Sequence, residues 1–318
     1  MNRLTSIILL AGAISLSALG LSDTAFANAP AKPQNQEEAA SSITKIPELS
    51  EEQLQGWVKK LNTYTSLFNS TSRGMDSWKR YQSWVNIKNG VTGKERHIYG
   101  LYSLHEYTMQ RNVPQALEAV KGEPRIERLD QLAADYIASY EKLFPVVKEA
   151  YNYYNRKDYS DDKFAKGKEM HPALVAAFQD YEGKRSLFDT ELTTIKEQVD
   201  LQFLDHIEKS EGKNYRWHSK RTLMAALKAV EALQAVNGQK DAHAFSEAIR
   251  KYAAIVHEFD DFIAANPDAE KLGSDLGTKP GRILAELRDA RDALEKGKID
   301  AFNRAAQDVI SQYNNMVR

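Results

Sequence analysis

The sequence contains no cysteine, which excludes disulfides, thiolate nucleophiles, cysteine-based zinc sites and thioether lipid anchors. It also lacks an excess of charge of either sign, since 43 Lys and Arg residues stand against 44 Asp and Glu residues. A balanced chain offers no extended positive field for polyphosphate, so we expect no nucleic-acid partner. The motifs HExxH, Gly-x-Ser-x-Gly and a glycine-rich dinucleotide turn are missing as well. We therefore expect no enzymatic activity, no cofactor and no metal site.

The N-terminus has the pattern of a signal peptide. Arg3 precedes an apolar run over residues 4–19, and small residues then lead to an A-x-A site, which predicts cleavage after Ala27 or Ala29. The run is shorter than the roughly 20 residues that a membrane-spanning helix needs, and no later segment is long and apolar enough. We therefore expect residues 1–27 to be removed on export and the mature chain, without a transmembrane segment, to reach the periplasm or the outside of the cell.

Residues 28–48 carry Ala, Pro, Gln, Glu, Ser and Thr and few large hydrophobic side chains. Such a stretch cannot bury enough apolar surface to offset the entropy lost on ordering. It is expected to be a flexible linker between the signal peptide and the folded part.

From Ser50 onward apolar residues recur every three or four positions, which is the spacing of amphipathic helices. The pattern predicts one long helix to about residue 85, a second over 124–159 and a third from Pro172 onward. No segment alternates apolar and polar residues as a strand would. The predicted fold class is all-α, with residues 49–214 forming an elongated bundle of long helices.

Local signals refine this prediction. Ser50 and Gln53 have the spacing of a capping box at a helix start. Gly90 and its neighbours predict a turn after the first helix. Pro145 is expected to kink the second helix, whereas Pro172 suits the first turn of the third.

The C-terminal part contains two similar segments, 221–233 and 282–294, each followed by a glycine-containing turn and a further helical pattern. A single helical hairpin leaves its apolar face exposed, and a second hairpin can cover that face. Residues 215–318 are therefore expected to form a four-helix bundle. The connection over 266–281 holds two prolines and three glycines and is expected to be a mobile loop.

The densest group of polar and aromatic residues lies between Tyr151 and His171. Acidic residues there suit a helix start with Ser160 as N-cap, and the tyrosines suit burial, which together are a structural interpretation. Tyrosines beside opposed charges also form recognition surfaces, which is the functional interpretation. The candidate binding surface comprises Tyr153, Asp158, Tyr159, Asp162, Lys166, Lys168 and His171, with Arg96 as a neighbour.

Two other patterns leave alternatives open. His257 and Asp261 share a helix face and could supply two metal ligands, although a solvated pair without a third ligand is the simpler interpretation. The basic residues between Lys209 and Arg221 could meet anionic lipid or sugar, or could form the hinge before the C-terminal bundle with Trp217 buried.

Several of these residues together resemble a known family. The stretches Gly90–Arg96 and Ile98–Tyr102, then Tyr153-Tyr154, Asp158-Tyr159, Asp162, Lys166-Gly167-Lys168 and His171, are similar to the YiiG-like family of bacterial envelope lipoproteins of unknown function. The resemblance extends from about Leu54 to the C-terminus. It implies an exported helical protein without an established activity, but the lipidation cysteine of such lipoproteins is missing here.

The leading hypothesis is a non-enzymatic exported binding or scaffold protein of the bacterial envelope, whose partner is another envelope protein or surface component. A metal-dependent hydrolase, or a carrier of a metal or small ligand with its site inside the bundle, is the alternative, because helical bundles gather ligands from distant helices. A membrane-surface protein is a third interpretation.

Overall fold

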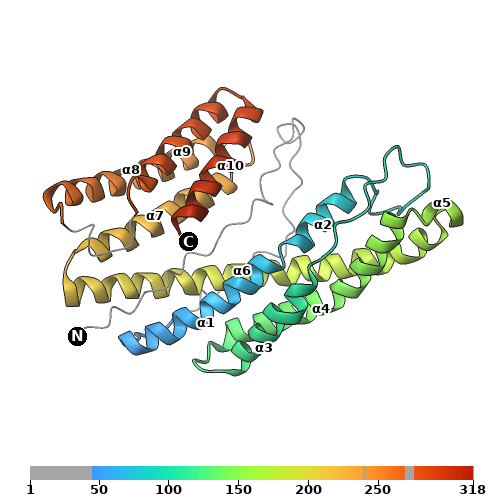
Figure 1. The fold of residues 1–318 in the computed structure, drawn as a ribbon, viewed down its shortest axis with the longest axis horizontal. Coiled ribbons are helices and arrows are strands. Elements are labelled where there is room, and N and C mark those ends of the chain that lie inside the picture. Colours follow the sequence, from blue (N-terminus) through green and yellow to red (C-terminus); the bar gives the residue numbers. More distant parts are fainter. Residues whose placement is uncertain (1–44, 239–240, 269–275, 318) are drawn as a thin grey trace. The chain divides into compact units, whose positions relative to one another are not determined.

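A computed structural model describes residues 45–238, 241–268 and 276–317 (Figure 1). Within these ranges the chain forms helices and no β-strand, apart from one isolated bridge between Asn86 and Gly90. The all-α prediction is therefore confirmed. The expected signal peptide and residues 28–44 of the expected linker lie outside the described residues.

The chain divides into two compact units. The aromatic unit comprises Gln55–Lys196, and the hairpin unit comprises residues 45–54 and 197–317. This boundary differs from the one expected between residues 214 and 215. The last part of the long helix α6 (Ala165–Glu211) belongs to the hairpin unit, since buried Asp200 pairs with Lys220 at 2.5 Å.

Residues 45–48 also differ from the flexible linker expected there. Ile46 and Leu49 are buried, and their backbone N–H groups donate to the side-chain amides of Gln198 and Gln202 at 3.0 and 2.9 Å. Side chains of α6 thus satisfy a backbone that has no secondary structure of its own.

The aromatic unit is built around tyrosine and phenylalanine rings from α1, α4 and α6, and Figure 1 shows α4 running beside the first part of α6. Tyr136 packs on Phe188 and Tyr181 with ring centroids 5.1 and 5.6 Å apart. Its elements in chain order are α1 (Glu51–Ser70) from Gln55 onward, α2 (Arg73–Gln82), the π-helix η5 (Thr108–Asn112), α3 (Val113–Lys121), α4 (Glu127–Arg156), α5 (Tyr159–Asp162) and the first part of α6.

The first predicted helix is in fact two helices. It begins with the expected capping box, because Ser50 N–H donates to Gln53 Oε1 at 2.8 Å and Gln53 N–H donates to Ser50 Oγ at 3.3 Å. The helix breaks after Ser70, where side chains of α6 donate hydrogen bonds to its backbone carbonyls. Arg185 donates to the Phe68 carbonyl at 2.9 Å, and the Tyr181 hydroxyl donates to the Thr71 carbonyl at 2.7 Å. These donors lie far away in sequence.

Pro145 and Pro172 both lie inside helices, but an internal position was expected only for Pro145. Pro145 lies inside α4, which continues through it to Arg156. Pro172 was expected in the first turn of a helix but lies inside α6, which already begins at Ala165. The earlier start has a cause in the sequence, since the Asp162 carboxylate accepts the Lys166 N–H at 2.9 Å and caps the helix.

The hairpin unit contains the predicted four-helix bundle. Helix α7 contacts α8, α9 contacts α10, and the two hairpins pack through α8 on α9 and α7 on α10. Part of the predicted loop over 266–281 is helical, because α9 already begins at Lys279, while residues 269–275 lie outside the described residues. The helices are α7 (Tyr215–Gln234), α8 (Ala242–Ala265), α9 (Lys279–Glu295) and α10 (Ile299–Met316).

The basic stretch between Lys209 and Arg221 forms the turn from α6 to α7. Asn214 caps α7 by accepting the Trp217 N–H at 3.1 Å, and Trp217 is buried. The cations of the stretch are paired with carboxylates, as in Lys213 with Glu208 at 3.4 Å and Arg221 with Glu258 at 2.5 Å. These pairs favour the structural interpretation over a surface for anionic lipid.

Candidate functional site

The segment Ser83–His105, between α2 and η5, has no regular secondary structure but follows a defined path along the corner where α4, α5 and α6 meet. Gly90 has a φ of 73°, and a β-carbon on it would lie 3.0 Å from His171 Cδ2. Gly93 has a φ of 82°, and a β-carbon there would lie 3.1 Å from Phe164. Both positions need glycine, for the left-handed backbone and for the close approach. We call Ser83–His105 the locked segment.

His171 of α6 contacts this segment at Ile87 and Gly90. It is buried, and its Nε2 lies 3.0 Å from the Ile87 carbonyl oxygen, while its Nδ1 lies 2.8 Å from the Tyr81 hydroxyl. A carbonyl only accepts, so Nε2 carries the proton and Nδ1 accepts from Tyr81. Burial raises the pKa of Tyr81, which keeps that hydroxyl a donor. His171 is therefore a packing residue rather than a surface contact.

Tyr153 and Asp162 are structural as well. The Tyr153 hydroxyl donates to Asp162 Oδ1 at 2.8 Å, and burial together with this bond raises the pKa of Tyr153 to about 12. Partial burial opposes ionisation of Asp162, but the bonds from Lys166 N–H and Tyr153 outweigh it and lower its pKa. Asp162, and not Ser160, caps α6, because its carboxylate accepts the Lys166 N–H. The N-cap position of α5 is occupied by Asp158.

The remaining candidate residues divide by exposure. Tyr159 is half-buried and stacks on Phe164, with ring centroids 4.8 Å apart. Lys166 is exposed and pairs with Glu149 at 2.7 Å, which raises its pKa. Arg96, Asp158 and Lys168 are exposed, and no contact among the described residues joins Arg96 to the other candidates. At this corner the packing and capping residues are therefore distinct from the exposed charged residues Asp158, Lys166 and Lys168.

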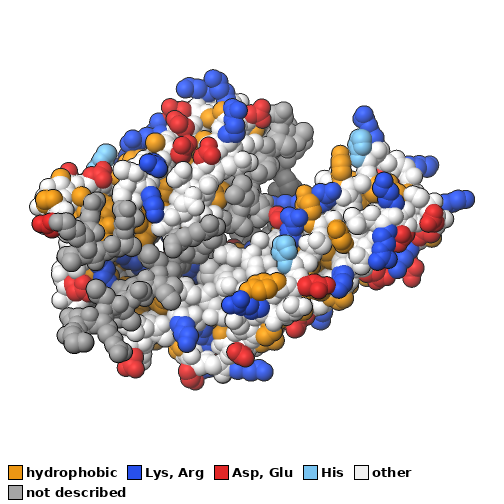
Figure 2. Space-filling view, viewed as in Figure 1, with side chains coloured by type: hydrophobic (Ala, Val, Ile, Leu, Met, Phe, Trp, Pro, Cys, Tyr) orange, Lys and Arg blue, Asp and Glu red, His pale blue; other side chains and the backbone are white. Residues whose placement is uncertain are grey.

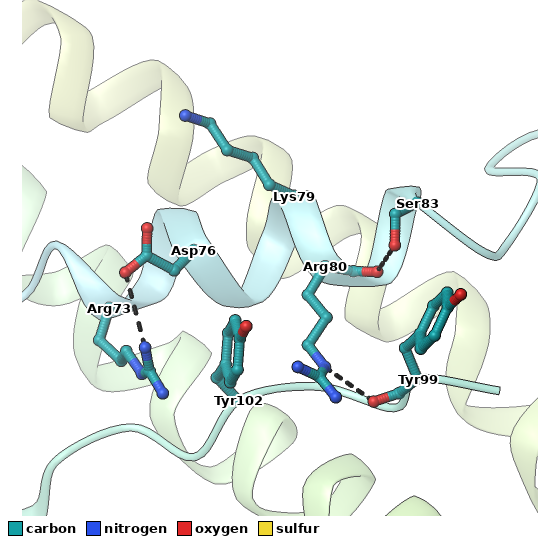
Figure 3. Close-up of a pocket in the computed structure, with 7 residues that line it drawn as sticks. All are labelled: Arg73, Asp76, Lys79, Arg80, Ser83, Tyr99 and Tyr102. Atoms are coloured by element: carbon teal, nitrogen blue, oxygen red, sulfur yellow. Dashed lines mark hydrogen bonds and ion pairs between the residues drawn. The ribbon is translucent and has the colours of Figure 1, made fainter. Parts of the chain in front are cut away.

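A second feature of the same segment was not predicted. Tyr99 and Tyr102 of the locked segment face α2 across a hollow of about 430 Å³ (Figure 3). Tyr102 stands between two guanidinium groups, with Cζ of Arg73 3.9 Å and Cζ of Arg80 4.3 Å from its ring centre. We call this hollow the arginine groove. Its lining residues are Arg73, Asp76, Lys79, Arg80, Ser83, Tyr99 and Tyr102.

The sequence predicts the α2 side of this groove but not the side formed by Tyr102. Arg73, Asp76 and Arg80 are three, four and seven positions apart, so they share one face of α2. Tyr102 reaches that face from an irregular segment, whose path no periodicity predicts. The hydroxyl of Ser77 holds it there by donating to its carbonyl at 3.0 Å.

The hairpin unit has a hollow of about 790 Å³ between residues 45–48 and the end of α6. Leu201 on its wall is 58% exposed, and His206 Nε2 lies 2.9 Å from the Leu49 carbonyl oxygen. That bond engages the histidine in holding the N-terminal segment.

The described parts of the chain contain no group of three or more histidine and carboxylate side chains that could hold a metal ion. Exposed His257 and Asp261 have no third ligand there. None of the helices within the described ranges combines the length and apolar character required to cross a bilayer. Figure 2 shows acidic and basic side chains interspersed over the visible face of the described residues.

Fold and site together define an all-α protein in which aromatic residues and glycines lock an irregular segment against a helical corner. The chain belongs to the family described as protein of unknown function (DUF3829), which it matches over residues 55–318. It is also similar to the protein named "Uncharacterized protein YiiG" of Escherichia coli (strain K12), with 28% identity over 170 residues, which are 53% of this chain and 48% of that protein. The chain thus spans about half the length of this relative. The predicted YiiG-like resemblance is confirmed, and no solved structure matches.

Proposed function

We propose that this protein is a non-enzymatic, exported binding or scaffold protein of the bacterial envelope, and that the locked segment presents its contact surface. One observation carries the proposal. The segment exceeds the roughly 12 to 15 residues that structureless loops in compact domains usually reach, and such long loops are mostly functional. Packing against His171 and Phe164 gives it one defined conformation, which reduces the entropy lost on binding.

The exposed side chains suit a protein or another polar envelope component. Lys94 and Arg96 project from the segment, and Lys168 and Asp158 lie exposed on the neighbouring corner. Charges of both signs favour a partner with complementary charges over a uniformly anionic polymer. Tyr99 on the same segment is 50% exposed, and tyrosine is enriched at protein interfaces.

Charge reversal tests the contact surface. The double variant Arg96→Glu/Lys168→Glu should lose the adducts that the wild-type chain forms when crosslinked in intact cells. Lys59→Glu/Lys142→Glu is the matched control, because both lysines are exposed on helices of the same unit and the net charge changes equally. If both variants keep or lose the adducts alike while far-UV circular dichroism is unchanged, the locked segment is not the contact surface.

Export rests on the N-terminal pattern and has its own test. The mature protein should begin at Asn28 or Pro30 when its N-terminus is sequenced, and it should fractionate with the periplasm or the medium. Recovery of an intact chain from the cytosol would overturn the envelope location.

A further inference from the structure

Arg80 of α2 is held in a fixed position by groups that carry no negative charge. Its Nε donates to the Tyr99 carbonyl oxygen at 2.7 Å, and its Cζ lies 4.3 Å from the centre of the Tyr102 ring (Figure 3). Among the residues that the structure describes, no carboxylate forms an ion pair with Arg80, and no acceptor is bonded to its Nη1 or Nη2. The terminal N–H groups therefore remain as donors for a ligand.

Asp76 is the acidic residue that would ordinarily pair with Arg80, because it lies four positions earlier on the same face of α2. The structure does not contain this pair. Oδ2 of Asp76 lies 3.8 Å from Nη1 of Arg73, whereas Arg80 is bonded to the Tyr99 carbonyl. Figure 3 shows Asp76 beside Arg73, and Lys79 directed away from both arginines. The charge of Arg80 is therefore left uncompensated within the groove.

The neighbours of Arg80 restrict how a ligand can bind to it. The Tyr102 ring covers one face of the guanidinium, and the Tyr99 carbonyl occupies the Nε position. The end that carries Nη1 and Nη2 is left, and its two parallel N–H groups match the two oxygens of a planar carboxylate. Such a pair needs only one guanidinium, and it lies in the plane of that group and not above the ring.

An exposed tyrosine next to this arginine favours a protein as the source of the carboxylate. Tyr99 is 50% exposed and stacks on exposed His97, with ring centroids 5.8 Å apart. Arginine and tyrosine are enriched among the residues that contribute most to protein–protein binding. Arg80 is already ordered in the free protein, so it loses little side-chain entropy when a partner binds.

We infer that Arg80 binds the carboxylate of an Asp or Glu side chain of the partner protein, and that Tyr99 packs against the residues beside that side chain. The inference rests on the proposed function, because it names the chemistry of the partner that the locked segment contacts. The uncompensated charge and the fixed guanidinium carry it, whereas Lys79 and the space between Arg73 and Arg80 have no part in it.

Carbodiimide coupling tests this contact, because the reagent joins an amine directly to a carboxylate that touches it and does not couple arginine. Arg80→Lys keeps the positive charge and introduces an amine. When intact cells with the full chain carrying Arg80→Lys are treated, mass spectrometry should find position 80 joined to an Asp or Glu of another protein. Arg282→Lys is the control, because Arg282 is exposed on α9 without an ion pair among the described residues. Position 282 should not be joined to that partner.

A synthetic peptide that contains the identified acidic residue then measures the affinity. Arg80→Gln should raise its dissociation constant about 10- to 100-fold, since charge-assisted hydrogen bonds are lost. A peptide with lysine in place of the acidic residue should bind Arg80→Glu more tightly than it binds the wild-type chain. A misfolded segment cannot produce this rescue, so the comparison separates a lost contact from a lost fold.

Coupling of position 80 to Asp76 alone would overturn the inference, because the acid of the same helix would then be the partner of Arg80. An unchanged dissociation constant in Arg80→Gln, or no rescue by the charge exchange, would overturn it as well. If Arg96→Glu/Lys168→Glu loses its adducts while position 80 is joined to no partner, the proposed function stands and this inference fails. Absence of adducts even in the wild-type chain would remove both.

Discussion

Gly90 and His171 lie so close that a β-carbon on Gly90 would be 3.0 Å from Cδ2 of His171. They are distant in sequence, but their contact fixes where the locked segment crosses the corner of α4, α5 and α6. His171 adds its bonds to Ile87 and Tyr81 at the same place. The path of the segment is therefore determined by buried neighbours and not by secondary structure.

Gly90→Ala should destabilise the protein. An alanine at a φ of 73° costs about 1 to 2 kcal/mol, and the new methyl group would also displace the His171 ring. Urea unfolding followed by circular dichroism measures the change. Gly183→Ala is the control, because Gly183 lies inside α6 with nothing within 4 Å of a β-carbon. That substitution should stabilise by about 0.5 to 1 kcal/mol, and equal effects of the two variants would contradict the proposed lock.

Asp130→Asn should be among the most damaging substitutions in the aromatic unit. Buried Asp130 accepts from Lys60 Nζ at 2.8 Å, from the Tyr64 hydroxyl at 2.6 Å and from Ile126 N–H at 3.0 Å. Removing its charge leaves the buried ammonium of Lys60 without a counter-ion, at a cost of about 3 to 5 kcal/mol. Exposed Asp135→Asn on the same helix should change the free energy of unfolding by less than about 0.5 kcal/mol. A similar small effect at Asp130 would show that the ion pair is dispensable.

Tyr136→Phe tests the acceptor set of buried Arg185. Nη1 of Arg185 donates to the Tyr136 hydroxyl at 2.6 Å, and Cζ lies 3.5 Å from the centre of the Phe68 ring. Without that hydroxyl the guanidinium loses an acceptor, which should cost about 1 to 3 kcal/mol in chemical unfolding. Half-buried Tyr151→Phe on the same helix serves for comparison. Equal stability of the two variants would mean that the Phe68 carbonyl and the hydroxyls of Thr71 and Tyr181 satisfy Arg185 without Tyr136.

The stability of the hairpin unit should depend on pH through His218. Burial lowers the pKa of His218; Glu258 acts against this, and Arg221 and Lys213 reinforce it. Because the folded-state pKa is below the unfolded value of about 6.5, this stability is complete above that value and is lost as the pH falls toward the folded pKa. The protection of amides in α7 and α8 of the full chain, measured as the intrinsic exchange rate at each pH divided by the observed rate, should fall between about pH 7 and pH 5. His218→Gln should flatten this dependence, and an unchanged slope would assign it to other groups.

The sequence predicted those parts of the fold that depend on local pattern. The Ser50 and Gln53 capping box and the pairing of the C-terminal helices follow from spacing alone. The break after Ser70 does not, because its donors are Tyr181 and Arg185, more than a hundred residues away. The earlier start of α6 was accessible in principle, since a carboxylate such as Asp162 is a common helix cap.

The composition directed attention to the corner of α4, α5 and α6, but it did not predict the structural role of each residue there. The stretch from Tyr153 to His171 does contact the locked segment, yet His171, Tyr153 and Asp162 are used for packing and capping. A pattern of tyrosines and charges cannot distinguish these roles, because both place polar atoms near aromatic rings. The arginine groove escaped prediction because Tyr102 has no helical register with Arg73 and Arg80.

The way in which the locked segment is held has an evolutionary consequence. The segment is anchored by its glycine backbone against the buried rings of His171 and Phe164, whereas the side chains of Lys94 and Arg96 are exposed. Substitutions at the outward positions therefore carry little folding penalty. A lineage can exchange them and acquire a different partner while the scaffold underneath stays the same.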